Sequence, residues 1–221
     1  MMLPGSFLAG LAEEDRAAMA ARWTVRQYGR KEMIIAHDEE SREVFFVLEG
    51  RARATVYSES GRAVAFRDIE PGGIFGELAA IDGRARSASV IALEPSRVAS
   101  MPDPAFHELV TSRPGLTWAL LTHLTLLIRH LTDRVYEFST LVVRKRLIRE
   151  LLRLAVDEED GSPAIRPAPT HFDLASRIST HREAVSREMS ALARQGLVEK
   201  RGNALILRHP AELERLCASE E

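Results

Sequence analysis

The sequence predicts an α+β fold with three parts: an amino-terminal antiparallel β-roll of the jelly-roll type, one long helix, and a carboxy-terminal group of short helices that ends in a β-hairpin. Three observations support this prediction. Short apolar segments separated by turn residues fill the region from about residue 24 to 101. No proline or glycine interrupts residues 116–138, and two short helical patterns are followed by a Gly202-Asn203 turn signal near the carboxy terminus.

Length and composition limit the class of protein. The 221 residues, 45% of them hydrophobic, suffice for one large domain or two modest ones, and the net charge of -2 creates no overall attraction to nucleic acid or membranes. The apolar run Phe7–Leu11 is short, so we expect no signal peptide, and no run approaches the roughly 18 apolar residues of a membrane span. The single cysteine, Cys217, excludes a disulfide or an iron–sulfur cluster within one chain. These features predict a cytoplasmic protein without membrane association.

The β-roll is expected to follow a short helical segment at residues 4–22. Its predicted strands are Met33–Ala36, Val44–Leu48, Ala52–Tyr57, Ala63–Ile69, Ala88–Leu93 and Arg97–Ser100. A barrel of this kind could also be a cupin-type metalloenzyme, but a metal site needs several convergent His, Asp or Glu side chains. Because His37 is the only histidine before residue 107, we predict neither a metal site nor enzyme activity.

A glycine-containing turn near residue 76 has the residue types of an anion-binding site. Gly76 allows the backbone to approach a ligand closely, and the amides that open the following turn can donate to phosphate oxygens. Arg86 can donate two hydrogen bonds to a phosphate, and Glu77 is an acceptor suited to a sugar hydroxyl. These groups together suit a ribose phosphate. The alternative is a Glu77–Arg86 salt bridge that only closes a surface loop.

The long helix carries a heptad-spaced series of mostly apolar residues. Its members follow alternating steps of four and three residues, which is the spacing of a two-stranded coiled coil. A continuous series on so long a helix predicts a homodimer, and burial of the series against its own domain is the alternative. The predicted dimer interface comprises Leu120, Leu124, Leu127, Leu131, Arg134 and Phe138.

The carboxy-terminal region predicts two short helices and a wing. A further helix is expected just before them, over residues 142–156. Thr170, followed three residues later by Asp173, indicates a capped helix start. A second helix is expected at residues 181–194, and residues 197–207 predict a hairpin with a basic tip. Two helices, a tight turn and a wing define a winged helix-turn-helix.

The order and spacing of these motifs resemble those of the Crp/Fnr family of transcription factors. In the β-roll the likeness rests on Phe75-Gly76-Glu77-Leu78-Ala79, Gly83 and Arg86-Ser87-Ala88, which resemble the phosphate-binding cassette of cyclic-nucleotide-binding domains. Near the carboxy terminus it rests on Leu-Ala-(x)2-Ile from Leu174 and on Arg-Glu-(x)2-Ser-Arg-Glu from Arg182. The resemblance implies a cyclic-nucleotide-binding β-roll domain at residues 1–112, a dimerisation helix at 113–140 and a winged helix-turn-helix DNA-binding domain at 141–221.

The resemblance also implies roles for individual residues. The ligand-binding set is Gly76, Glu77, Leu78, Ala79, Arg86, Ser87, Ala88 and Thr132. The side of the recognition helix that faces DNA carries Arg182, Glu183, Ser186 and Arg187, of which the two arginines and the glutamate read bases. Phosphate contacts fall on Thr170, Ser179, Thr180, His181, Lys200 and Arg201.

On this resemblance the chain is a homodimeric, ligand-controlled transcription regulator that binds palindromic double-stranded DNA, with RNA polymerase as a further partner. Cyclic AMP is the first choice of effector and cyclic GMP the second. Leu131 and Thr132 occupy the positions at which a relative has a threonine and a serine that contact adenine. Ser87 can contact a phosphate or a purine amino group. The family often has a glutamine where Phe172 stands, so one DNA contact differs here.

Other functions remain open at this point. His123 and His130 lie one heptad apart on the long helix and could ligate haem, as in gas sensors of the same superfamily. A family member could also act without a nucleotide, or the β-roll could be a cyclic-nucleotide module that acts on a protein partner.

Overall fold

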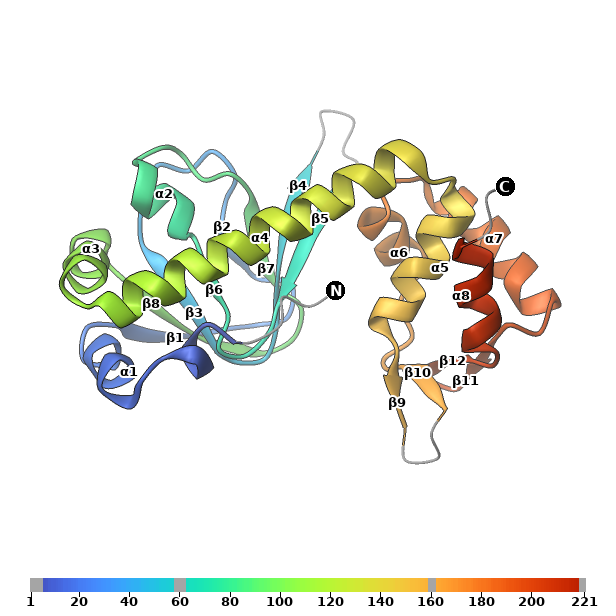
Figure 1. The fold of residues 1–221 in the computed structure, drawn as a ribbon, viewed down its shortest axis with the longest axis horizontal. Coiled ribbons are helices and arrows are strands. Elements are labelled where there is room, and N and C mark those ends of the chain that lie inside the picture. The colour runs from blue at the N-terminus through green and yellow to red at the C-terminus, as the bar shows by residue number, and fades with distance from the viewer. Residues whose placement is uncertain (1–5, 58–62, 159–161, 219–221) are drawn as a thin grey trace. The chain divides into compact units, whose positions relative to one another are not determined.

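The computed structural model describes residues 6–57, 63–158 and 162–218, and it confirms the predicted α+β class (Figure 1). The chain forms two compact units, an N-terminal unit that ends at Leu131 and a C-terminal unit that begins at Thr132. The division falls within the long helix α4 (Pro114–Thr140), so each unit contains part of this helix.

Two four-stranded antiparallel sheets form the β-roll of the N-terminal unit, with strand orders β1-β8-β3-β6 and β2-β7-β4-β5. The first sheet contains β1 (Thr24–Tyr28), β8 (Ser96–Met101), β3 (Val44–Glu49) and β6 (Ile74–Phe75). The second contains β2 (Met33–Ile35), β7 (Ser89–Ala92), β4 (Ala52–Tyr57) and β5 (Ala63–Ile69). The sequence did not predict β1, which is largely exposed and mostly polar, or β6, which is only two residues long.

Strand β3 organises the core of the β-roll because both of its faces are buried. Phe45 and Val47 point between the two sheets, while Val44 and Phe46 pack on the helical side. This arrangement explains the unbroken apolar run of β3, since a strand buried on both faces needs no polar alternation. The β-roll therefore has one core between its sheets and a second core beneath its helices.

The helices of the N-terminal unit cover the second of these cores. They are η1 (Leu8–Gly10), α1 (Glu13–Ala20), α2 (Glu77–Asp82), α3 (Asp103–Ser112) and the first part of α4. Figure 1 shows α4 lying across the β-roll. Leu116 and Leu120 of α4 are buried in the core that contains Phe46. Within the described ranges, no helix has the length and apolar character needed to cross a bilayer.

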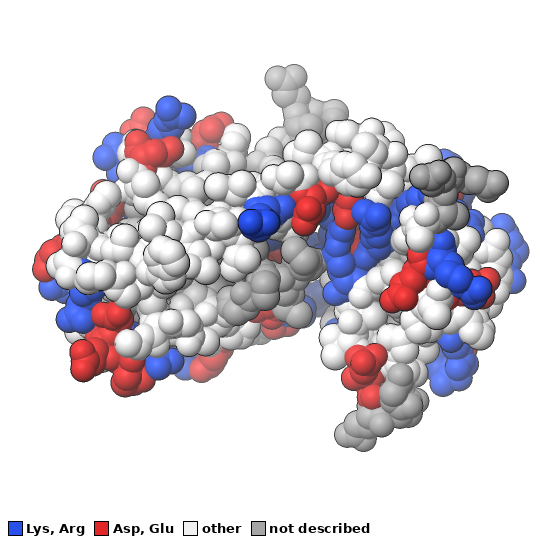
Figure 2. Space-filling model, in the orientation of Figure 1, with Lys and Arg blue, Asp and Glu red and all other residues white. Residues whose placement is uncertain are grey.

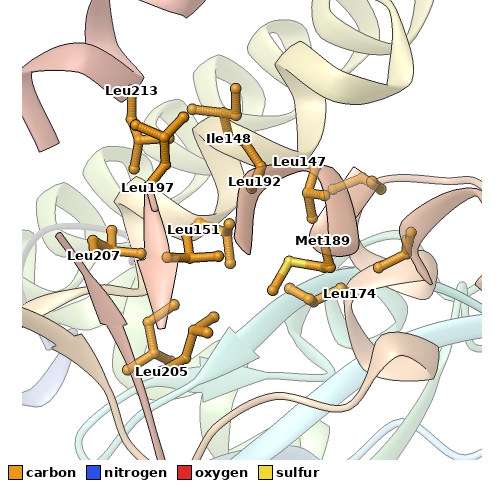
Figure 3. Close-up of a cluster of buried hydrophobic side chains, with 14 of the residues drawn as sticks. Leu147, Ile148, Leu151, Leu174, Met189, Leu192, Leu197, Leu205, Leu207 and Leu213 are labelled. Atoms are coloured by element: carbon orange, nitrogen blue, oxygen red, sulfur yellow. The ribbon is translucent and has the colours of Figure 1, made fainter. Parts of the chain in front are cut away.

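The C-terminal unit contains a helical bundle and a small sheet of order β11-β12-β10-β9. Its helices after α4 are α5 (Val143–Leu154), α6 (His171–Arg177), α7 (Arg182–Arg194) and α8 (Pro210–Ala218). Its strands are β9 (Val156–Asp157), β10 (Pro163–Ile165), β11 (Val198–Arg201) and β12 (Ala204–Leu207). Figure 3 shows the core, in which side chains from α5 to α8 meet those of the β11–β12 hairpin.

A cluster of buried charges joins the end of α4 to α5 and α6 within this unit. The Glu150 carboxylate, 4% exposed, lies 3.1 Å from a guanidinium nitrogen of each of three arginines: Arg134, Arg153 and Arg177. Burial would raise the pKa of Glu150, but the three positive charges outweigh it and hold that pKa below its usual value. Glu150 is therefore ionised and fixes three helices relative to one another.

We expect Glu150→Gln to destabilise the C-terminal unit by about 3–5 kcal/mol at pH 7, because removing one partner leaves buried charges uncompensated. A carboxyl whose pKa is lowered by folding stabilises the fold above its unfolded-state pKa of about 4.3, and that stability is lost as the pH falls further. Unfolding measured by circular dichroism between pH 3 and 7 should therefore show a pH dependence that the variant lacks.

The matched control is Glu199→Gln. Glu199 also pairs with two arginines, Arg201 and Arg208, but its side chain is 42% exposed. Solvent screens exposed pairs of this kind and they contribute little to stability, so this change should be nearly neutral. Equal effects of the two substitutions would show that burial of Glu150 has no special importance.

Candidate ligand cavity and DNA interface

The turn between β6 and α2 depends on glycine. Gly76 has φ 80°, a left-handed conformation that other residues adopt at a cost. A Cβ atom at this position would lie 2.8 Å from Nη1 of Arg86 and 2.9 Å from the carbonyl oxygen of Glu43. Glycine thus permits both the turn and the close approach of the arginine.

Arg86 is 2% exposed and makes three hydrogen bonds to the protein. Its Nε donates to Oγ of Ser41 (3.0 Å), its Nη1 to the carbonyl oxygen of Gly76 (2.9 Å) and its Nη2 to the carbonyl oxygen of Glu43 (2.8 Å). A guanidinium group has five N–H groups, so one on each Nη atom remains for a ligand. A guanidinium group can donate two of its N–H groups to two oxygens of one phosphate.

Glu77 is also 2% exposed, and two cationic or ionisable groups approach the same carboxylate oxygen. Nη2 of Arg67, on β5, lies 3.9 Å from Oε1, and Nε2 of His123, on α4, lies 3.5 Å from it. Burial would raise the pKa of Glu77, but the His123 contact and the Arg67 charge together hold it below its usual value. The predicted alternative, a surface salt bridge between Glu77 and Arg86, is not formed, since both residues are buried and neither is the other's ion-pair partner.

These residues border a cavity of about 240 Å³ in the N-terminal unit. The polar side chains of its lining are those of Arg67, Glu77, Arg86 and Ser87. The rest of the lining is apolar or glycine and comprises Ile35, Ala54, Phe66, Phe75, Gly76, Leu78, Ala79, Ala88, Val90, Leu127 and Leu131. The cavity thus has a charged end near the α2 turn and extensive apolar walls.

The structure brings seven of the eight predicted ligand residues together at the cavity, and the role of Thr132 stays a prediction. Gly76, Glu77, Leu78, Ala79, Arg86, Ser87 and Ala88 all line the cavity. Thr132 does not, because its position on α4 is exposed. Sequence reasoning missed Arg67, whose position in β5 carries no local sign that a charged side chain would be buried.

The heptad series that the sequence predicts as the dimer seam makes contacts within the chain itself. Leu120 is buried in the core, Leu124 packs against it, and Leu127 and Leu131 line the cavity. In the C-terminal unit, Arg134 donates to Glu150 and lies over the ring of Phe138, 4.6 Å from its centroid. Leu120 and Arg134 are buried in the chain's own structure and the other four are half-buried, so the dimer contact itself stays a prediction.

A second, offset series on α4 is exposed instead. Its large apolar members include Trp118 (73% exposed), Leu121 and Ile128 (64% exposed) in the N-terminal unit and Val135 in the C-terminal unit. Their spacing of three and seven residues is again heptad-like. Since α4 is apolar on two faces, spacing alone could not show which face packs inward.

The C-terminal unit contains the predicted winged helix-turn-helix. Thr170 caps α6 as predicted, because its Oγ1 accepts a hydrogen bond of 3.0 Å from the amide of Asp173. Ser179 has φ 50° in the turn that leads from α6 to α7. Nδ1 of His171 lies 2.8 Å from Oγ of Ser186, which joins the two helices directly. No pattern in the sequence indicates this contact.

Most of the predicted DNA-binding side chains lie at the surface. Exposed members of the set are Thr170, His181, Arg182, Glu183, Arg187, Lys200 and Arg201, and the partly buried ones are Ser179, Thr180 and Ser186. Arg201 is paired with Glu199 on the wing at 2.9 Å. In Figure 2, Lys and Arg side chains gather along the edge of the C-terminal unit that α7 occupies in Figure 1. The arrangement presents a basic surface of the kind that binds phosphates.

The two histidines considered as haem ligands are engaged inside the protein. Nε2 of His123 faces Glu77, and Nε2 of His130 lies 3.2 Å from the carbonyl oxygen of Phe66. In the part of the chain that the structure describes, no group of three or more His, Cys, Asp or Glu residues could hold a metal ion.

Comparisons with known proteins agree with both halves of this architecture. Residues 25–113 match the family model for the cyclic nucleotide-binding domain, and residues 145–216 match the model for the Crp-like helix-turn-helix domain. The transcriptional regulator SdrP of Thermus thermophilus is 31% identical over 160 residues, which cover 69% of this chain and 72% of SdrP. A CRP-like cAMP-activated global transcriptional regulator of Mycobacterium tuberculosis is 22% identical over 209 residues, 93% of each chain.

Among solved structures, the c-di-GMP responsive global regulator CLP of Xanthomonas campestris has the same fold. Its TM-score is 0.81 at 17% identity, over 89% of this chain and 99% of CLP. A nucleotide-binding type of β-roll followed by a helix-turn-helix defines a transcription regulator that binds DNA, and not an enzyme. The chain belongs to the Crp/Fnr family.

Proposed function

We propose that this regulator is controlled by a cyclic nucleotide that binds in the N-terminal cavity, with cyclic AMP as the first choice and cyclic GMP as the second. The observation that carries the proposal is the charged end of the cavity. Arg86 keeps one N–H group free on each Nη atom, and Glu77 is held there as an ionised acceptor. The charges of Arg67, Arg86 and Glu77 sum to +1, which matches a cyclic phosphodiester with its single negative charge.

The apolar walls suit a purine base but offer little to select between adenine and guanine. Leu127, Leu131 and Phe66 can pack on the faces of a base, whereas Ser87 is the only hydroxyl in the lining. Apolar pockets discriminate weakly between similar ligands. The Mycobacterium tuberculosis relative is named for cAMP and CLP for c-di-GMP, so family membership leaves the effector to experiment.

We further propose a cytoplasmic homodimer whose two recognition helices read a palindromic site, with RNA polymerase as a partner. The exposed series of α4, with Trp118, Leu121 and Ile128, replaces the predicted seam as the dimer contact. Ligand binding would alter the packing of α4 and so the spacing of the two DNA-binding units. The ligand can shift the equilibrium between two arrangements of the dimer only by the difference between its affinities for them.

Calorimetric titration with cyclic AMP and cyclic GMP tests the nucleotide site. We expect saturable binding of at least one nucleotide and a loss of about 100-fold in affinity in Arg86→Ala, because a buried charge-assisted contact to phosphate is removed. The matched control is Arg84→Ala, since Arg84 lies on the same loop but its side chain is 86% exposed. Absence of heat from the folded wild type would favour a nucleotide-independent regulator or another effector.

Sedimentation velocity tests the dimer. Ile128→Arg places a charge at the centre of the exposed series and should convert a dimer to a monomer at micromolar concentration. Tyr57→Arg, at a 50% exposed aromatic side chain on β4, should leave the dimer intact. A dimer unaffected by Ile128→Arg would place the interface elsewhere.

Binding to DNA fragments selected from a random pool tests the reading residues, with bound nucleotide where the titration shows one. Arg187→Ala should cost about 1–3 kcal/mol on the preferred site and relax the base preference at one position of each half-site. Lys200→Ala should weaken binding to all sequences and reduce the slope of affinity against salt by about 1. If Lys200→Ala relaxes the base preference and Arg187→Ala weakens binding to all sequences equally, Lys200 reads a base and Arg187 contacts a phosphate.

A further inference from the structure

His123 is a buried side chain with an unusual environment. It lies on α4, is 9% exposed, and contacts the ring of Phe7 edge-on at a centroid distance of 6.2 Å. Its Nε2 atom points to Oε1 of Glu77 at 3.5 Å, which is too long for a good hydrogen bond. Among the described residues, this buried nitrogen has no hydrogen-bond partner. Buried polar atoms are nearly always paired, so an unpaired one beside a candidate ligand-binding carboxylate needs an explanation.

Two side chains compete for the same oxygen of Glu77. Arg67 also approaches Oε1, at 3.9 Å, and donates its hydrogen bond of 2.8 Å to the carbonyl oxygen of Ile74 instead. Glu77 lines the cavity, whereas His123 lies behind it and does not. A hydrogen bond from Nε2–H of a neutral imidazole would hold Oε1 and leave Oε2 to face the cavity. Without that bond, the nearby positive charge of Arg67 would draw the carboxylate toward itself.

We infer that His123 is a positioning residue that aligns Glu77 to accept a hydrogen bond from the sugar hydroxyl of the ligand. The contact between His123 and Glu77 shortens when the hydroxyl binds, so the sugar is sensed by α4 itself, about two helical turns before Leu131 at the end of the cavity. This inference rests on the proposed nucleotide function. It gives the long helix a polar connection to the α2 turn in addition to its apolar contacts.

The test compares the affinity of the full chain for cyclic AMP with that for 2′-deoxy cyclic AMP, which lacks the only free hydroxyl of the ribose. We expect the wild type to prefer the ribose form about tenfold or more, as for a hydrogen bond to a charged group. His123→Leu should reduce the preference to less than about threefold without weakening the deoxy form. His123→Gln, whose amide nitrogen can donate from a similar position, should restore most of the preference.

Two controls separate positioning from a general loss of structure. His130→Leu removes the other buried histidine of α4, which faces Phe66 and not Glu77, and should leave the ratio of the two affinities unchanged. Glu77→Gln should lower the ratio by itself, and His123→Leu should then have no further effect on it. Circular dichroism and thermal unfolding establish that each variant is folded.

The outcomes are distinct. A folded His123→Leu variant that keeps the wild-type ratio would overturn the inference and leave the nucleotide site standing. Equal affinity of the wild type for both compounds would also overturn the inference but not the proposed function, because Glu77 would then not bind the hydroxyl. Failure of the wild type to bind any cyclic nucleotide would overturn both the inference and the proposed function.

Discussion

Packing of α4 on the β-roll is the interaction on which the N-terminal unit depends. Leu116 and Leu120 complete a hydrophobic core, and each buried leucine stabilises the fold by about 1.5–3 kcal/mol. Further along the same face, Leu127 and Leu131 form a wall of the cavity. The helix that stabilises the β-roll therefore also closes the candidate binding site. A molecule in the cavity would contact this helix directly, with no intervening loop.

Buried carboxylates that contact basic side chains recur in both units and have similar consequences. Glu77 meets Arg67 and His123 from two different elements, and Glu150 meets three arginines from three helices. The cost of removing such charges from water offsets much of their attraction, so they add little net stability. Removing one partner is nevertheless costly, and this restricts each cluster to one arrangement. Such clusters define how elements are placed relative to one another more than how strongly they are held.

The sequence predicted the features that depend on residues close together in the chain. It did not predict the features that depend on contacts between residues far apart in the chain. Residues 76–88 form one continuous segment of a turn, helix α2 and the loop that leads to β7, so their types and spacing specified the charged end of the cavity. The sequence could not show which face of α4 packs on the β-roll, because two heptad series fit the same helix and only contacts such as the packing of Leu120 distinguish them. His123 and Arg67 were missed as neighbours of Glu77, since they are separated from it in sequence and no periodic pattern marks a buried charge.

The division of the cavity into a charged end and apolar walls affects how such a protein can evolve. Arg86 is held by the carbonyl oxygen of Gly76, in a turn that admits no larger residue without strain, and by Ser41 and Glu43 of a second segment. The walls come from separate elements, with Ile35 on β2, Phe66 on β5 and Leu127 on α4. Exchanges among apolar side chains at these wall positions would reshape the space for a ligand's body while the anchoring loop stayed the same. Duplicated genes could therefore acquire new chemical signals through single substitutions, and a protein engineer could retarget the sensor by the same route.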